Sequence, residues 1–180
     1  MAAADSRPSI LIDGAHHARE LTSISMVMYT MIRLLHGYLN SDSQTNQILG
    51  TSGIYFIPIV NWDSVKLISD TFAKNGRLDF IRKNRHESNQ VNCVGEDIGV
   101  DLNRNYGYKF GVDNEGSENL PCSEDYRGPK AFSEAETRAI RDVVSALAHL
   151  KIALNFHAWG NLFVIPFNYS DDSAGNELIT

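Results

Sequence analysis

The sequence lacks a long hydrophobic segment. Its most apolar stretch, residues 21–39, is interrupted by Arg33 and His36, whereas a membrane-spanning helix needs about 20 consecutive, predominantly apolar residues. Residues 1–8 also lack the apolar run of a secretory signal peptide. We therefore expect no membrane partner, and no signal peptide within this chain.

Positive charge is also scarce. Lys and Arg number 16 against 22 Asp and Glu, which gives a net charge of -6. Binding to phosphate backbones needs a basic surface, so we expect no nucleic acid as a partner. The chain has 180 residues, of which 43% are hydrophobic, and we find no repeat and no linker. These features predict one domain that is large enough to bury a core.

Cysteine is limited to Cys93 and Cys122. From the count alone, two buried free thiols and one disulfide remain alternatives. A disulfide that closes a loop of this length would stabilise the fold by about 3–4 kcal/mol in the chain-entropy model. It would also indicate an oxidising compartment.

The hydrophobic pattern predicts an α/β domain with a mixed central sheet flanked by helices. Short apolar runs predict strands at 9–13, 54–60, 151–156 and 162–166. Apolar residues at helical spacing predict a helix over 20–39 and a second helix around 63–73. A further helix begins at 132–136, where Ser133 and Glu136 have the spacing of a capping box. Its buried stripe is expected to comprise Ala139, Ile140, Val143, Val144, Leu147 and Leu150. Residues 107–119 are rich in Gly, Asn and Glu and predict a loop.

A histidine and a glutamate directly follow the first predicted strand. His17 and Glu20 are three positions apart, so both side chains would lie on one face of the first helical turn. Imidazole and carboxylate groups are good zinc donors. The spacing alone is a weak signal, because many such pairs lie on protein surfaces. His16, four positions before Glu20, is an alternative ligand with an equally compatible spacing.

A third ligand has to come from a distant part of the chain. His157 directly follows the predicted strand 151–156, and ligand sites in open α/β sheets gather beyond the carboxyl ends of strands. A purely structural histidine is the alternative at this position. Three protein ligands would leave one zinc position for water, which is the arrangement of catalytic rather than structural zinc sites.

Several motifs occur together in a specific order. They are His17-Ala18-Arg19-Glu20, Arg82, Asp101-Leu102-Asn103-Arg104-Asn105, Cys122-Ser123-Glu124, Phe132-Ser133-Glu134-Ala135-Glu136 and Phe156-His157. In this order they resemble the funnelin (M14) family of zinc metallocarboxypeptidases over residues 7–169. The resemblance implies that residues 1–180 form part of a zinc carboxypeptidase catalytic domain with a phosphorylase/hydrolase-like α/β fold, incomplete at both ends. It also implies secretion, or a location in the lumen of the secretory pathway.

The resemblance assigns the metal centre first. It implies one Zn²⁺ held by His17, Glu20 and His157, with His17 rather than His16 as the ligand. Asp101 would accept a hydrogen bond from the outer nitrogen of His17, which fixes the tautomer of a ligand histidine. Cys93 and Cys122 would form a disulfide.

The resemblance also assigns residues that bind the substrate, which would be the C-terminus of a peptide or protein. Asn103 and Arg104 would bind the terminal carboxylate, which an arginine can bind in a bidentate manner. Arg82 would stabilise the oxyanion of the transition state. Arg19 would bind the peptide farther from its end.

Part of the family's catalytic machinery has no counterpart in this sequence. The family's general-base glutamate lies farther along the chain than Glu177, which follows His157 too soon to match it. We therefore expect either an inactive fragment or a site completed by a further segment or chain, and the preferred C-terminal residue stays undetermined. One alternative function is a non-catalytic module that binds zinc and a C-terminal carboxylate. Another is a zinc amidohydrolase of the aspartoacylase type, because that type also combines H-x-x-E with a distant histidine and an Asp-Leu-Asn-Arg segment.

Overall fold

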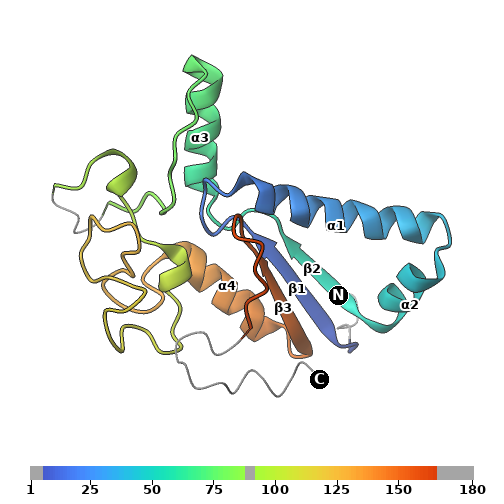
Figure 1. Ribbon diagram of the computed structural model, residues 1–180. Coiled ribbons are helices and arrows are strands. Elements are labelled where there is room, and N and C mark those ends of the chain that lie inside the picture. The colour runs from blue at the N-terminus through green and yellow to red at the C-terminus, as the bar shows by residue number, and fades with distance from the viewer. Residues whose placement is uncertain (1–5, 88–91, 166–180) are drawn as a thin grey trace.

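A parallel sheet of three strands lies at the centre of the fold, in the order β2-β1-β3 (Figure 1). The computed structural model describes residues 6–87 and 92–165. The strands are β1 (Ser9–Gly14), β2 (Gly53–Ile57) and β3 (Leu150–Phe156). The helices are α1 (Leu21–Leu39), α2 (Ser43–Thr51), α3 (Trp62–Asn75) and α4 (Ala135–Ala146), and the short 3-10 turns are η1 (Gly95–Asp97) and η2 (Leu102–Arg104).

The central strand β1 is buried because it has a neighbour on each side. Asp13 of β1 is aligned with Ile57 of β2 and with Asn155 of β3. Since all three strands are parallel, their carboxyl ends meet at one edge of the sheet. The segments that follow β1 and β3 therefore begin side by side, although they are far apart in the sequence.

Helix α1 lies close to the end of β1, and a glycine allows this approach. A Cβ atom at Gly14 would lie 3.0 Å from the Cγ2 atom of Val27 and 3.1 Å from the carbonyl oxygen of Ser23. Val27 is fully buried, whereas Ile32 and Leu35, two of the apolar residues whose helical spacing forms one face of α1, are each 57% exposed. The described residues thus bury only part of that face.

The elements predicted at 9–13, 20–39, 54–60, 63–73 and 151–156 are confirmed, with shifted ends. Strand β2 ends at Ile57 instead of Val60 because Pro58 has no N–H group for the sheet ladder. Helix α2 was not predicted, since its sequence is mostly polar and has no clear apolar stripe. Its start is marked by Asp42, whose side chain accepts a hydrogen bond of 2.8 Å from the Thr45 amide.

The capping box predicted for α4 is wrong. Glu134 is the N-cap residue, and its side chain makes no capping hydrogen bond. The hydroxyl of Ser133 donates to Glu134 Oε1 at 2.6 Å and accepts from the amide of Asn105 at 2.8 Å. The carboxylate of Glu136 accepts a hydrogen bond from Asn84. The side chains of Ser133 and Glu136 therefore form hydrogen bonds with other side chains instead of capping the helix.

The buried stripe predicted for α4 is also only partly correct. Ile140 is buried, and Val143 and Leu147 are half-buried, but Ala139 and Val144 are exposed. The helix therefore contacts the described part of the fold along a narrower strip than its apolar pattern indicates.

The last predicted strand is not present over Leu162–Ile165, and Pro166 lies outside the described residues. An apolar run becomes a strand only if a sheet edge pairs with it, and these four residues pair with no strand in the described part of the chain. The α/β class with a sheet flanked by helices is confirmed, while the strands among residues 6–87 and 92–165 are all parallel. None of the helices described there combines the length and apolar character needed to span a bilayer.

A disulfide and a buried lysine hold the long irregular region between α3 and α4. Cys93 and Cys122 are bonded, with 5.2 Å between their Cα atoms, so the alternative of free thiols is excluded. The ammonium group of Lys83, a residue only 1% exposed, donates to the carbonyl oxygens of Pro121 and Ser123 at 2.9 and 2.7 Å.

The loop predicted at 107–119 is confirmed. The Arg127 side chain donates to the main-chain oxygens of Asp113 and Ser117 within this loop.

Candidate metal centre

Two histidines and a glutamate converge at the carboxyl edge of the sheet. His17 and Glu20 lie in the turn between β1 and α1, and His157 directly follows β3. His17 Nδ1 lies 2.7 Å from Glu20 Oε1, and His157 Nδ1 lies 2.8 Å from Glu20 Oε2. One donor atom from each residue lies within 4.8 Å of the other two. The structure thus brings together the three residues expected to form the ligand set.

The local geometry of the first two residues differs from the expectation. His17 and Glu20 do not lie on the first turn of α1, because the helix begins at Leu21. They are joined by a tight turn in which the Glu20 amide donates to the carbonyl oxygen of His17 at 3.1 Å. The three-residue spacing still places both side chains together, although the helical explanation for it is wrong.

Within residues 6–87 and 92–165, the cluster is exposed to solvent mainly at His157. The side chains of His17 and Glu20 are 4% and 9% exposed, whereas that of His157 is 30% exposed. The amide of Ala158 also donates to Glu20 Oε2, at 3.1 Å. A ligand that reaches these donor atoms from solvent would therefore approach beside His157.

His16 is turned away from the cluster. Its Nε2 atom lies 2.6 Å from the hydroxyl of Tyr106, and its Nδ1 atom lies 2.8 Å from the amide nitrogen of Asn155. Both ring nitrogens of His16 are therefore engaged elsewhere, which favours His17 as the ligand.

Asp101 is fully buried and lies next to the ring of His17. Its Oδ1 atom accepts hydrogen bonds from His17 Nε2 at 3.1 Å and from the Asn103 amide at 2.9 Å. Its Oδ2 atom accepts from Arg82 Nε and Nη2 at 2.9 and 2.7 Å. Arg82 Nη1 extends toward the cluster, 3.2 Å from His17 Nδ1 and 3.9 Å from Glu20 Oε1. A single buried carboxylate thus orients both a candidate ligand and the arginine beside it.

These contacts shift the protonation equilibria of the cluster. Burial favours the neutral acid at Glu20, but hydrogen bonds from His157 and His17 outweigh it and hold the pKa of Glu20 well below its usual range. Burial also opposes charge on Asp101, yet the hydrogen bond from His17 and the nearby charges of His17 and Arg82 lower its pKa to about 2. The hydrogen bonds to Asp101 and Glu20 raise the pKa of His17 despite its burial. Both carboxylates are therefore ionised at neutral pH, and that of Glu20 is available to a cation.

The residues expected to bind substrate lie on segments that adjoin the cluster. Asn103 and Arg104 belong to η2, directly after Asp101; Asn103 is exposed and Arg104 is half-buried. Arg104 Nε donates to the carbonyl oxygen of Gly116, and its Nη1 donates to that of Asn103 at 3.2 Å. The contact with Gly116 holds the guanidinium against the 107–119 loop.

Arg19 lies between the two candidate ligands in sequence, but its side chain points to another part of the surface. Its guanidinium pairs with Glu124 and lies 5.4 Å from the ring centroid of Phe80. The motifs in the sequence identified Arg19 but indicated no function for Glu124 or Phe80.

Sequence reasoning also missed a polar group beside the cluster, formed by Asp13, Asn155 and Tyr106. Asp13 is the last polar residue of β1 and Asn155 precedes His157 by two positions. Residues two apart on a strand share a face, so the alternation of β3 could have identified Asn155. Tyr106 has no comparable local signal, because only the fold brings it to His16.

Burial raises the pKa of Asp13 to about 6, although a hydrogen bond from Asn155 opposes the shift. Between the usual value of 3.8 and about 6, the folded state therefore binds more protons than the unfolded state. The free energy of unfolding should consequently fall as the pH rises through this window. Because Asn cannot ionise, the free energy of unfolding of Asp13→Asn relative to that of the parent should rise by roughly 2 kcal/mol between pH 4 and pH 7. Urea unfolding of both proteins with a chelator present measures the difference, and an equal offset at both pH values would contradict this prediction.

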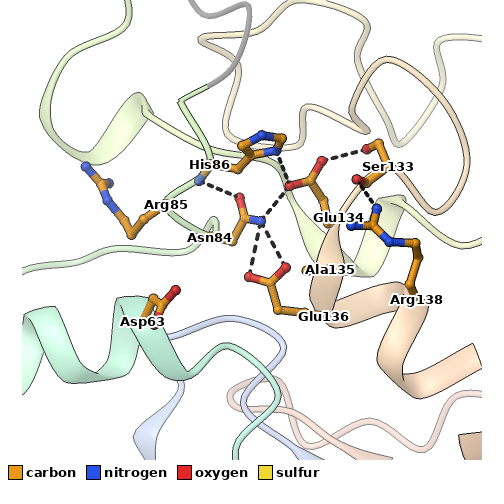
Figure 2. A pocket seen from close by; sticks show the side chains of 9 residues that line it. All are labelled: Asp63, Asn84, Arg85, His86, Ser133, Glu134, Ala135, Glu136 and Arg138. Carbon is orange, nitrogen blue, oxygen red and sulfur yellow. Dashed lines mark hydrogen bonds and ion pairs between the residues drawn. The ribbon is translucent and has the colours of Figure 1, made fainter. Parts of the chain in front are cut away.

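A separate cavity of about 260 Å³ lies at the amino ends of α3 and α4 (Figure 2). Figure 2 shows the Asn84 amide between the carboxylates of Glu134 and Glu136, with His86 bonded to Glu134 at 2.8 Å. None of the residues expected in the site lines this cavity. The candidate metal centre and this cavity are therefore distinct.

Comparison with known proteins identifies the family of this cluster. The family described as zinc carboxypeptidase (Peptidase M14) matches residues 2–178. The chain belongs to the zinc carboxypeptidase family. It is 33% identical over 168 residues to carboxypeptidase B of Astacus astacus, covering 92% of this chain and 50% of that protein. It is 34% identical over 176 residues to carboxypeptidase B of Helicoverpa zea, covering 97% of this chain and 38% of that protein.

Solved structures agree with this membership of the zinc carboxypeptidase family. The crystal structure of thrombin-activatable fibrinolysis inhibitor aligns with a TM-score of 0.81 at 27% identity, covering 97% of this chain and 41% of that one. The bovine protein of that name, in complex with tick carboxypeptidase inhibitor, aligns with a TM-score of 0.76 at 27% identity, covering 94% and 52%. The chain thus spans about half, or less, of the length of these relatives.

The family implies zinc, and the donor set fits it. Two imidazole nitrogens and one carboxylate oxygen are donor types that catalytic zinc sites use, and here they lie within 4.8 Å of one another. The hydrogen bond from His17 to Asp101 is the kind of contact that supports a ligand histidine.

Proposed function

We propose that residues 1–180 form part of the catalytic domain of a zinc-dependent metallocarboxypeptidase, which hydrolyses the C-terminal peptide bond of peptides and proteins. The observation that carries the proposal is the convergence of His17, Glu20 and His157, with Asp101 bonded to the outer nitrogen of His17. When bound at such a site, zinc polarises the carbonyl group and lowers the pKa of water toward about 7, which supplies a nucleophile near neutral pH.

Arg82 is the proposed stabiliser of the oxyanion. Asp101 engages its Nε and Nη2 atoms, which leaves Nη1 directed at the ligand atoms. A guanidinium held in this way does not have to reorganise when negative charge develops on the scissile carbonyl oxygen.

Arg104 and Asn103 are the proposed anchor for the substrate carboxylate. Arg104 has five N–H donors, and two of them contact the main-chain oxygens of Gly116 and Asn103. The remaining donors can bind a carboxylate, while the exposed Asn103 side chain offers an amide beside it. Arg19, paired with Glu124, would contact the peptide farther from its end.

A mass-spectrometric assay tests the proposal directly. The zinc-loaded protein, together with the further segment or chain that completes the site, is incubated with peptides that end in Phe, Lys or Glu, and with the same peptides as C-terminal amides. We expect the loss of one residue from the free acids and none from the amides. Arg104→Gln should lower kcat/KM on the order of 10- to 100-fold, because it removes hydrogen bonds to a charged group. Arg77→Gln, an exposed arginine near the end of α3, is the matched control and should match the parent.

Other outcomes of this assay would replace the proposal. Binding of the free acids in preference to the amides, with zinc bound and no hydrolysis, would indicate a non-catalytic module that recognises a C-terminal carboxylate. Hydrolysis of N-acyl amino acids without any action on peptides would indicate the amidohydrolase alternative. Undiminished peptidase activity in a zinc-free preparation would contradict zinc dependence.

The disulfide supports a proposal about location. Disulfides persist in oxidising compartments, and Cys93 and Cys122 are bonded here. We therefore infer that the protein acts outside the cell or in the lumen of the secretory pathway, where the C-termini of peptides and proteins would be its substrates.

A further inference from the structure

Four polar residues form a hydrogen-bonded chain directly beside the candidate metal centre. The Asn155 amide donates to Asp13 Oδ1 and lies 2.8 Å from His16 Nδ1. His16 Nε2 lies 2.6 Å from the hydroxyl of Tyr106. We name these four residues, Asp13, His16, Tyr106 and Asn155, the polar clamp. Nothing in the proposed reaction requires them.

The hydrogen-bond directions in the polar clamp follow from donor and acceptor chemistry. The carboxylate of Asp13 only accepts, so the amide nitrogen of Asn155 faces it and also donates to His16 Nδ1. A neutral His16 then carries its proton on Nε2 and donates it to the Tyr106 oxygen. Each member therefore has a partner of the correct type, as buried polar groups require.

The polar clamp joins the strands at the positions from which both histidine ligands extend. Asp13 and Asn155 are aligned across the β1–β3 ladder. His17 follows Asp13 by four residues, and His157 follows Asn155 by two. The rings of His17 and His157 consequently lie 4.8 Å apart between centroids, and their relative position depends on the register that this pair holds.

Tyr106 connects a third segment to the same point. It follows Arg104 by two residues, on the segment that also carries Asp101. Its ring packs edge-on against Phe132 with centroids 5.9 Å apart, while its hydroxyl reaches His16. The hydrogen bond between Tyr106 and His16 thus links the segment of Asp101 and Arg104 to the turn that carries His17 and Glu20.

We propose that the polar clamp, through the Tyr106–His16–Asn155 hydrogen bonds, positions His17 and His157 for metal binding and is required for full Zn²⁺ affinity. None of its members contacts the metal or the substrate in this proposal, so they are positioning residues. The inference depends on the proposed metal centre.

Tyr106→Phe tests the polar clamp in the full chain, because it removes the hydroxyl and keeps the ring that packs on Phe132. Zn²⁺ affinity is measured by competition with a chromophoric chelator, and the ligand geometry by the visible absorption of bound Co²⁺. We expect affinity to fall roughly 10-fold, the lower end of the loss caused by removing partners behind a ligand, with a changed Co²⁺ spectrum. Tyr29→Phe, an exposed tyrosine on α1, is the matched control and should retain the parental affinity and spectrum.

A second pair of variants separates positioning from general loss of stability. His16→Gln keeps a side-chain amide that can donate to Tyr106, whereas His16→Leu keeps none. We expect His16→Gln to retain more Zn²⁺ affinity than His16→Leu and a Co²⁺ spectrum closer to that of the parent.

The outcomes distinguish this inference from the proposed function. If Tyr106→Phe has the Zn²⁺ affinity and Co²⁺ spectrum of the parent, or if the two His16 variants lose equal Zn²⁺ affinity, the proposed role of the polar clamp is wrong. The proposed metal centre would not be affected by either result. A parent chain that binds neither Zn²⁺ nor Co²⁺ would overturn the metal centre itself, and the polar clamp with it.

Discussion

His17→Ala is expected to lower Zn²⁺ affinity by more than about 100-fold, since even the hydrogen-bond partners of a metal ligand contribute about 10- to 100-fold. His17 is one of three residues that supply donor atoms to the cluster in the described part of the chain. Its loss leaves Glu20 and His157 as two ligands, which is fewer than catalytic zinc sites use. Peptidase activity should be lost together with the metal. Chelator competition measures the affinity, and the mass-spectrometric assay measures the activity.

His36→Ala is the matched control for this prediction, because His36 is an exposed histidine on α1. It should bind Zn²⁺ like the parent. A large loss of affinity in His16→Ala combined with full affinity in His17→Ala would contradict the assignment, because it would make His16 the ligand.

Asp101→Asn is expected to destabilise the metal-free protein by about 3–5 kcal/mol, the range for breaking a buried ion pair by removing one partner. Asp101 is fully buried and accepts hydrogen bonds from His17 and Arg82 on its two oxygens. An amide at this position places an N–H group against one of these donors and leaves the Arg82 charge without its carboxylate. Zn²⁺ affinity should also fall by about 10- to 100-fold, because the orientation of His17 is no longer fixed.

Urea unfolding in the presence of a chelator measures the stability change, and Asp142→Asn is its matched control. Asp142 pairs with Arg141 on the exposed surface of α4, where an ion pair contributes at most about 1 kcal/mol. Equal free energies of unfolding of the two variants would show that the buried ion pair of Asp101 stabilises the fold no more than an exposed one does. Unchanged Zn²⁺ affinity in Asp101→Asn would contradict its role behind His17.

Much of the fold follows from local patterns. The apolar runs at 9–13 and 151–156 are short and bounded by polar residues, so burial in a sheet was their predictable outcome, and both are strands. The run at 162–165 has the same local character but does not form a strand. The difference lies in the available neighbours: β3 pairs with β1, whereas Leu162–Ile165 has no strand partner among the described residues. Pairing between distant segments cannot be read from a local pattern.

The ligand set was predictable in type, but the choice between adjacent histidines was not. His16 and His17 have equally suitable spacings to Glu20, and the resemblance alone favoured His17. In the structure Ala15 adopts a positive φ of 54° at the end of β1. The turn that follows directs His16 to Tyr106 and Asn155, and His17 to Glu20. The backbone of this turn therefore separates the two histidines.

The sequence by itself determined which chemical groups this chain offers: the donor types of His17, Glu20 and His157, the carboxylate of Asp101, and the arginines. Motif order determined the family, because these residue types recur in a fixed succession along the chain. Only the tertiary structure decided which atoms meet. Glu20 and His157 are 137 positions apart, and parallel pairing of β1 with β3 brings them together. The same pairing aligns Asp13 with Asn155 and thereby forms the polar clamp, because hydrogen bonds between distant residues exist only once the strand register is set.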